Sequence, residues 1–180
     1  MCGCGGCPRP RRLLEIDEVM VVVPDMMARL QQVSDFKGKE GGMFYLLDQA
    51  GNVLVEPTAI GKVAEDKLAK YTELCQEKAS RLRQRRLDGH EEWQSWESRD
   101  AENGKWGGAI FDGRYYWSFS GLTEEQDEAL MVMSAHMCGQ MMNGSPEVYA
   151  KTSDNRVILD NEGLFWSFPI VSSDEPELSK

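Results

Sequence analysis

One long amphipathic stretch, from about residue 60 to residue 87, constrains the fold of this chain more than any other feature. Apolar side chains recur in it with the helical period of about 3.6 residues, and Lys, Glu and Arg fill the positions between them. A helix of this kind buries its apolar face across a sheet. The pattern predicts a helix from Ile60 to Leu87 that Asp88-Gly89 ends. Its apolar stripe comprises Ile60, Val63, Ala64, Leu68, Tyr71, Leu74, Cys75, Ala79 and Leu82.

Two hairpins are predicted, one on each side of this helix. Met43–Asp48 and Asn52–Glu56 have strand patterns joined by a short connection, and Pro57-Thr58 is expected to end the second strand. Lys105–Phe111 and Arg114–Ser120 form the other pair. The two residues between them are Asp and Gly, which tolerate positive φ and are the strongest short signal for a hairpin.

The segments before and between these elements are harder to assign. Leu13–Val23 fits both a helix and a buried strand, and Val21, Val22 and Val23 favour the strand because branched Cβ atoms suit a pleated surface. Pro24-Asp25 is then typical of the first turn of a helix, where the missing donor of proline is tolerated. Glu92–Arg99 is predicted as an edge strand.

A capping box marks the start of a further helix. The Thr123 hydroxyl can accept a hydrogen bond from a free backbone amide, and the Gln126 side chain can reach back. This helix is expected to run to about Met142. Arg156–Asp160 and Leu164–Phe168 are predicted as a last pair of strands.

The order of elements predicts a single α+β domain over residues 13–172. We expect an antiparallel sheet of about five strands with helices packed on its faces, and a length of 180 residues suits one domain. Residues 1–12, rich in Cys, Gly, Pro and Arg, are expected to form a flexible tail that folding does not need. The acidic residues 173–180 are expected to form a second tail.

The charge of the chain argues against nucleic acid as a partner. The formal net charge is -10, whereas phosphate backbones are bound by clustered Lys and Arg. The dense basic run falls at the end of the long helix, where positive charge complements the helix dipole. No apolar run is long enough to span a membrane and no secretory signal is present, so we expect a cytoplasmic protein. The basic run consists of Arg81, Arg83, Arg85 and Arg86.

Three stretches resemble the GlcG/HbpS-like family, and one of them, Ala69–Thr72, resembles a piece of its central helix. The other two are longer. The first is Gly107–Gly113 continued by Ser118–Glu128, with a paired glycine, two strands, Ser-Gly and a Glu-Gln-Asp-Glu helix start; the second is the Leu47–Leu54 hairpin. The resemblance covers roughly Met43–Met142 and implies a profilin-like sandwich that is commonly oligomeric. Some members of the family bind haem, so the resemblance also implies a tetrapyrrole as a possible cofactor. The bulk of Trp117 and Phe119 departs from the family pattern.

The second hairpin also holds the best candidate for a pocket. Paired glycines in a strand permit a close backbone approach or a bulge, and aromatic residues next to them can line an apolar site. They can equally fill the core or an interface. In the following Met-rich helix, His136 could ligate haem iron, although packing is the ordinary role of such a helix. The candidate residues are Trp106, Gly107, Gly108, Trp117, Phe119 and His136.

Cys2, Cys4 and Cys7 are the candidate metal ligands. Three clustered thiols can hold zinc or contribute to an iron–sulfur cluster, although a structural zinc site needs a fourth ligand. Acylation beside Arg9, Arg11 and Arg12 would instead anchor the chain to a membrane. A reduced, inert tail is the third possibility.

No catalytic triad and no phosphate-binding glycine loop can be recognised in the sequence. We therefore predict a non-catalytic module that binds a small apolar ligand, such as haem or another tetrapyrrole, or a protein partner. The alternative is a structural protein that assembles with itself or with other chains through exposed Trp93 and Trp96 and a sheet edge. A homo-oligomer is expected in either case.

Overall fold

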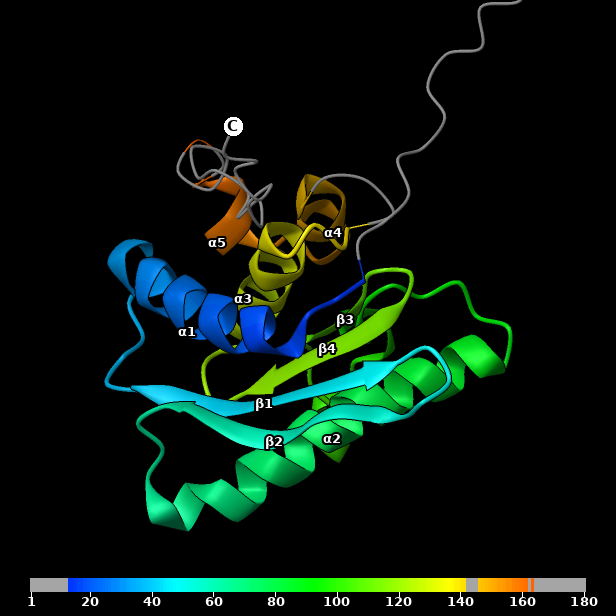
Figure 1. Ribbon diagram of the computed structural model, residues 1–180, viewed down its shortest axis with the longest axis horizontal. Coiled ribbons are helices and arrows are strands. Elements are labelled where there is room, and N and C mark those ends of the chain that lie inside the picture. The colour runs from blue at the N-terminus through cyan, green and yellow to red at the C-terminus, as the bar shows by residue number, and fades with distance from the viewer. Residues whose placement is uncertain (1–12, 142–145, 162, 164–180) are drawn as a thin grey trace, which may run out of the picture.

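The computed structural model describes residues 13–141, 146–161 and 163, and it has the predicted α+β architecture (Figure 1). A single antiparallel sheet has the strand order β2-β1-β4-β3, with helices on both of its faces. The fold class is confirmed, and the sheet contains four strands where about five were expected. The strands are β1 (Gly41–Asp48), β2 (Val53–Gly61), β3 (Ala109–Phe111) and β4 (Tyr115–Ser120).

The first hairpin forms as predicted, but its second strand does not end at Pro57. Phe44 pairs with Thr58, and Leu46 pairs with Val55, so two residues of β2 lie opposite one residue of β1. This bulge contains Pro57, which has no amide proton and is tolerated where the regular pairing is interrupted. The strand therefore passes the proline and continues to Gly61.

The second hairpin forms as predicted, but its turn lies one residue later: Asp112 lies opposite Tyr115, so Gly113 and Arg114 are the two turn residues, and Gly113 has a φ of 107°. β3 is shorter than expected because it begins at Ala109 and not at Lys105. β4 lies next to β1 and pairs with it from Met43↔Ser120 to Asp48↔Tyr115. The two hairpins thus join through their inner strands, which places the start of α3 close to the start of β1.

The long helix α2 (Glu65–Leu87) covers one face of the sheet (Figure 1). Cys75, Ala79 and Leu82 are fully buried there, in one cluster with side chains of β1 and the second hairpin. The helix begins five residues after the predicted start at Ile60, because β2 extends to Gly61.

The opposite face is covered by α1 (Ile16–Val33) and α3 (Glu124–Met137). The prediction of a strand at Val21–Val23 was wrong, and so was the helix start at Pro24, which lies inside α1. Tertiary packing overrides the β propensity of valine here. The buried residues recur with the helical spacing. Val21, which lies between the buried Val19 and Val22 in the sequence, is exposed. The buried stripe is Val19, Val22, Val23, Met26, Met27 and Leu30.

The capping box at the start of α3 is confirmed, since the Thr123 hydroxyl accepts the amide proton of Gln126 and the Gln126 side chain accepts that of Thr123. α3 ends at Met137, before the expected Met142, and Gly139 follows with a φ of 68°. Two short helices then pack against α3, and neither was predicted. They are α4 (Pro146–Ser153) and α5 (Arg156–Leu159).

The prediction of a terminal strand at Arg156–Asp160 was therefore wrong, because a helical turn occupies it. Its partner Leu164–Phe168 lies outside the described residues, as do the two predicted tails. The predicted edge strand Glu92–Arg99 is also wrong. The segment forms a 3₁₀ turn, η1 (Ser95–Ser98), and reaches the sheet through one bridge between Gln94 and Ile110.

Arg81 on α2 fastens this segment to the rest of the domain. Its guanidinium donates hydrogen bonds to the carbonyl oxygens of Ser95, Ser98 and Trp106 at 2.6–2.9 Å. A short 3₁₀ turn, η2 (Ala101–Asn103), lies within the same loop. The arginine run at the end of α2 thus has a structural use beyond the helix dipole, and it positions Trp106 at the side of the site described next.

Candidate functional site

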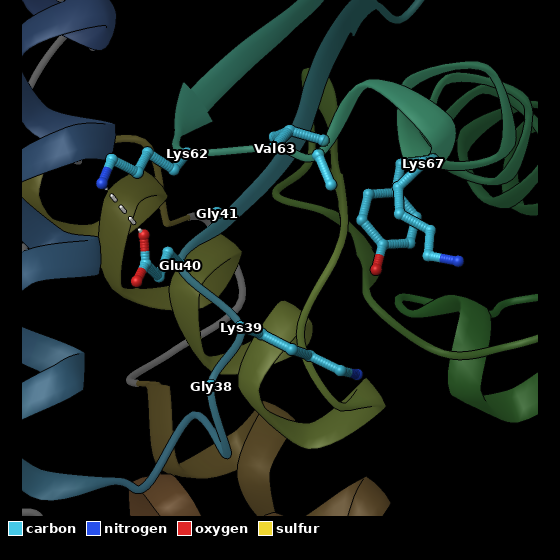
Figure 2. Close-up of a pocket in the computed structure, with 9 residues that line it drawn as sticks. Gly38, Lys39, Glu40, Gly41, Lys62, Val63 and Lys67 are labelled. Carbon is cyan, nitrogen blue, oxygen red and sulfur yellow. Dashed lines mark ion pairs between the residues drawn. The ribbon is translucent and has the colours of Figure 1, made fainter.

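Two adjoining hollows lie where the start of β1 and the start of α3 meet α2. The first has a volume of about 460 Å³ and lies between the loops before β1 and after β2. Figure 2 shows Lys62 turned toward Glu40, while Lys39 extends away from that pair. The second, which we call the Trp106 pocket, has a volume of about 410 Å³. The two hollows share Lys39 and Tyr71.

The Trp106 pocket has an apolar wall and a polar floor. Trp106 comes from the loop that Arg81 fastens, Leu74 from α2, and Leu122 from the turn after β4. Lys39 and Lys70 lie at the exposed part of the lining, and Lys78 and Asp127 lie at its buried part. The pocket therefore joins aromatic and aliphatic surface to a small set of charged groups.

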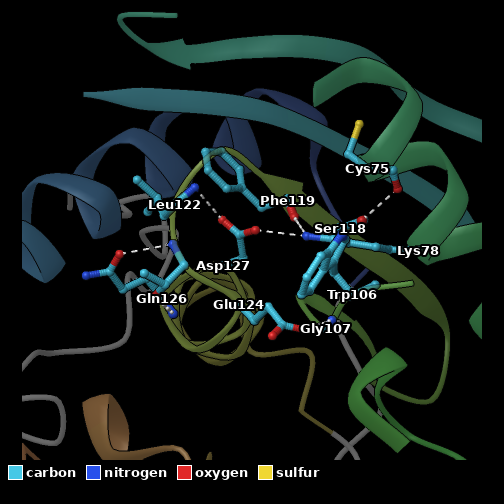
Figure 3. Close-up of polar contacts among 12 residues, drawn as sticks. Cys75, Lys78, Trp106, Gly107, Ser118, Phe119, Leu122, Glu124, Gln126 and Asp127 are labelled. Atoms are coloured by element: carbon cyan, nitrogen blue, oxygen red, sulfur yellow. Dashed lines mark hydrogen bonds and ion pairs between the residues drawn. The ribbon is translucent and has the colours of Figure 1, made fainter. Parts of the chain in front are cut away.

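The floor is a buried ion pair between two helices (Figure 3). Lys78 Nζ on α2 lies 2.8 Å from Asp127 Oδ2 on α3, and the two side chains are only 2% and 3% exposed. The ammonium group also donates to the carbonyl oxygen of Phe119 at 3.0 Å. The second carboxylate oxygen of Asp127 accepts the backbone amide of Leu122 at 2.9 Å. These bonds hold both charged groups in fixed positions.

Burial raises the pKa of Asp127 above its ordinary value of 3.8, and the neighbouring ammonium of Lys78 and the amide of Leu122 oppose that rise. A buried carboxylate without such partners would carry a large desolvation cost. The pair is thus a unit in which each charge makes the burial of the other tolerable.

Gly107 and Gly108 permit the close approach that the paired glycines suggested. A Cβ atom on Gly108 would lie 2.7 Å from the Cβ of Asp127 and 2.9 Å from Lys78 Nζ, and the φ of this residue is +113°. The amide of Gly107 donates to Glu124 Oε1 at 2.7 Å. The glycines therefore bring this strand end against the first turn of α3 and shape the floor, without lining the pocket themselves.

The structure does not bring the remaining predicted site residues to this pocket. Trp117 and Phe119 are fully buried in the core, where the Trp117 indole donates to Asp112 at 2.6 Å. His136 lies twelve residues after Glu124 on α3, which is roughly 18 Å along the helix axis. Burial lowers the pKa of His136, which favours its neutral form. Of the candidates for ligand contact, only Trp106 lines the Trp106 pocket within the described part of the chain.

Trp93 and Trp96, which we expected to be exposed, are half-buried and already in contact with other groups. Trp93 stacks on Phe111 with a centroid distance of 5.6 Å, and the Arg99 guanidinium lies 4.8 Å from the ring of Trp96. Each ring is therefore only partly exposed, and the use of either tryptophan in assembly stays a prediction.

Cys2, Cys4 and Cys7 lie outside the described residues, so the metal and acylation hypotheses stay predictions. Within residues 13–141, 146–161 and 163 no group of three His, Cys, Asp or Glu side chains could hold a metal ion. Among the same residues, none of the helices is both long enough and apolar enough to cross a membrane.

The sequence analysis did not single out Lys78, and it included Asp127 only as part of the Glu-Gln-Asp-Glu helix start. A signal for Lys78 was present, because it follows Leu74 and Cys75 by four and three residues and so continues the apolar stripe of α2. A charged residue on a buried face requires a partner. Its identity could not be read from the sequence, because Asp127 lies 49 residues further along the chain.

No protein-family model, no curated protein and no solved structure matches this chain. The resemblance to the GlcG/HbpS-like family therefore rests on the motifs quoted above and remains a prediction.

Proposed function

We propose that this chain is a non-catalytic module that binds a small, partly apolar ligand in the Trp106 pocket. The observation that carries the proposal is an open hollow built on a fixed floor. Trp106, Leu74 and Leu122 offer apolar surface beside the Lys78–Asp127 pair. Ligand sites are typically concave and mostly apolar, with a few placed polar groups.

The chemistry of the floor favours binding over catalysis. Lys78 and Asp127 neutralise each other and are nearly inaccessible, so neither is available to attack or protonate a ligand. The neighbouring Cys75 does not line the pocket, and burial raises the pKa of its thiol to about 12, which keeps it protonated and unreactive. Lys78 and Asp127 therefore support a role in shaping the pocket.

A tetrapyrrole is the planar ligand that the family resemblance suggests. Tyr71 lines the pocket and carries an oxygen donor of a kind that can ligate haem iron, whereas His136 does not line it. We expect haemin to give a saturable shift of the Soret band with one equivalent per chain. Trp106→Ala and Tyr71→Phe should weaken binding, and His136→Ala should leave it unchanged.

The haemin titration has outcomes that separate these ideas. No saturable shift would rule out the tetrapyrrole. A shift that is lost in His136→Ala but kept in Trp106→Ala would move the site to the other end of α3. Either result would exclude haem as the ligand of the Trp106 pocket.

A second candidate function is assembly with another chain, because one edge of the sheet is covered and the other is not. β2 lies at one edge of the sheet, and among the described strands it pairs only with β1. The other edge is covered, because the amide of Phe111 donates to the Trp93 carbonyl and Gln94 bridges Ile110. An uncovered edge strand can pair with a second chain.

Light scattering of the wild type and of Val53→Lys tests assembly through β2. Val53 is 43% exposed at the start of β2, so lysine there should oppose pairing without disturbing the core. A dimer that becomes monomeric in Val53→Lys would support assembly. A wild type that is monomeric at tens of micromolar would contradict it, since an interface worth roughly 6 to 7 kcal/mol is populated at that concentration.

A further inference from the structure

Positive charge gathers around the two hollows although the whole chain has a net charge of -10. Their combined lining contains five lysines and three carboxylates. Each carboxylate already has a cation within 4 Å: Lys62 pairs with Glu40, Arg99 with Glu124, and Lys78 with Asp127. The three other lining lysines are Lys39, Lys67 and Lys70.

Two of these three lysines have no carboxylate partner among the described residues. Lys70 forms no ion pair there, and Lys39 forms only a hydrogen bond, from Nζ to the carbonyl oxygen of Leu122 at 2.9 Å. That bond holds the ammonium of Lys39 at the boundary of the two hollows, with two further N–H groups available for a ligand. Lys67 pairs with Asp66, but both side chains are at least half exposed, so their interaction is weak.

The arrangement of α2 brings Lys70 to the same place. Lys70 precedes Leu74 by four residues and Tyr71 by one, and all three line the Trp106 pocket. Residues separated by one helical turn share a face, so the side of α2 that carries the apolar wall also carries the ammonium. A lysine on a fully solvated face would lack this apolar neighbour.

We infer that the Trp106 pocket takes a ligand with an acidic group, a carboxylate or a phosphate, bound by Lys39 and Lys70 while its apolar body lies against Trp106. This inference rests on the proposed function, because it names the ligand class of the same pocket. A neutral apolar ligand would leave Lys70 without a carboxylate within 4 Å among the described residues, and Lys39 with only the longer-range attraction of the Asp127 carboxylate. A charge-assisted hydrogen bond to each is expected to improve affinity about tenfold.

Calorimetric titration of the full chain with three naphthalene probes tests the inference. The probes are 2-naphthoate, 1-naphthyl phosphate and the uncharged 2-naphthamide, so the aromatic body is constant and the acidic group varies. We expect at least one anion to bind ten times or more tighter than the amide, and to weaken as salt rises because exposed ammonium groups are screened. The preferred anion identifies carboxylate or phosphate as the acidic group.

Three variants connect the binding to named residues. Lys39→Gln and Lys70→Gln should each weaken the anion about tenfold and leave the amide unchanged. Lys62→Gln is the matched control, because it removes the same charge from a lysine that is paired with Glu40 and turned away from Lys39. It should leave the affinity for the anion unaltered.

The possible failures are distinct. Equal affinity for the amide and both anions, lost in Trp106→Ala, would overturn the acidic ligand and keep the binding module. Anion binding that survives Lys39→Gln and Lys70→Gln would also overturn the inference. An absence of binding by all three probes would count against the proposed function itself.

Discussion

Replacing Glu128 with Gln should abolish a large part of the pH dependence of stability. Glu128 on α3 is fully buried, and its Oε1 accepts hydrogen bonds from the Ser153 hydroxyl and from Asn155 Nδ2, the latter at 3.0 Å. Its Oε2 is buried and has no hydrogen-bond partner among the described residues. Burial raises the pKa of Glu128 from 4.5 to about 7, against the effect of those two hydrogen bonds.

The sign and size of the effect follow from this raised pKa. An unfolded chain loses the proton near pH 4.5, whereas the folded chain keeps it until about pH 7. Between these values the folded state binds more protons than the unfolded state, so stability falls as pH rises and is level above pH 7. One pKa unit is worth about 1.4 kcal/mol, so the loss is about 3 kcal/mol.

Urea unfolding at pH 5 and pH 8 measures this loss. The quantity to compare is the difference in unfolding free energy between the two pH values, because a constant cost of the Gln amide then cancels. We expect Glu128→Gln to reduce that difference by about 2 to 3 kcal/mol relative to the wild type. Glu125→Gln, which removes a charge from an exposed position three residues away on the same helix, is the control. Equal differences in the wild type and Glu128→Gln would refute the reasoning.

Two further predictions concern the pocket floor. Lys78→Met should lower the free energy of unfolding by about 3 to 5 kcal/mol, because it leaves Asp127 buried without its cation. The double variant Lys78→Met with Asp127→Leu should regain much of that stability in the same urea assay. A single variant within about 1 kcal/mol of the wild type would contradict a buried pair. Gly108→Ala should cost at least about 1 kcal/mol more than Gly89→Ala, since both glycines have positive φ but a Cβ atom on Gly89 meets no atom within 4 Å. Equal losses of unfolding free energy in the two variants would show that Asp127 and Lys78 can move aside for the added Cβ atom.

The elements that could be predicted are those whose signal is local. Asp112-Gly113 specifies its hairpin by backbone preference, and Thr123 with Gln126 specifies the start of α3 by two reciprocal hydrogen bonds. In both cases a few adjacent residues carry the whole cause. The long stripe of α2 is similar, because its period alone requires a buried face.

The elements that were predicted wrongly depend on distant partners. Val21, Val22 and Val23 prefer a strand in isolation, but the helical spacing of the residues around them fits a stripe that packs on the sheet. The loop from Glu92 to Trp106 contains 3₁₀ turns, and it is held from a distance by Arg81, which donates to three of its carbonyl groups. Part of the cause was local, since Glu97 accepts the amides of Trp93 and Gln94, but the contact with Arg81 is not visible within the segment itself.

The candidate site was predicted only in part for the same reason. Trp106, Gly107 and Gly108 were placed at one sheet end by their own sequence, and the structure keeps them there. His136 was added because a histidine can ligate iron, without any constraint on where α3 would carry it. The lysines come from the loop before β1 and from α2, and only the fold brings them beside Trp106.

The buried pair and the exposed lysines have separable roles, and the variants above can distinguish them. A buried ion pair is weak evidence for stability, because apolar residues of similar size can replace both partners. If the double variant Lys78→Met with Asp127→Leu folds and still binds the naphthalene anions, the pair acts only as a scaffold. Binding would then depend on Lys39 and Lys70. Both are exposed to solvent and can contact a ligand without first breaking an ion pair. If the double variant folds and loses the anions, the charge of Lys78 contributes to binding through the pocket floor.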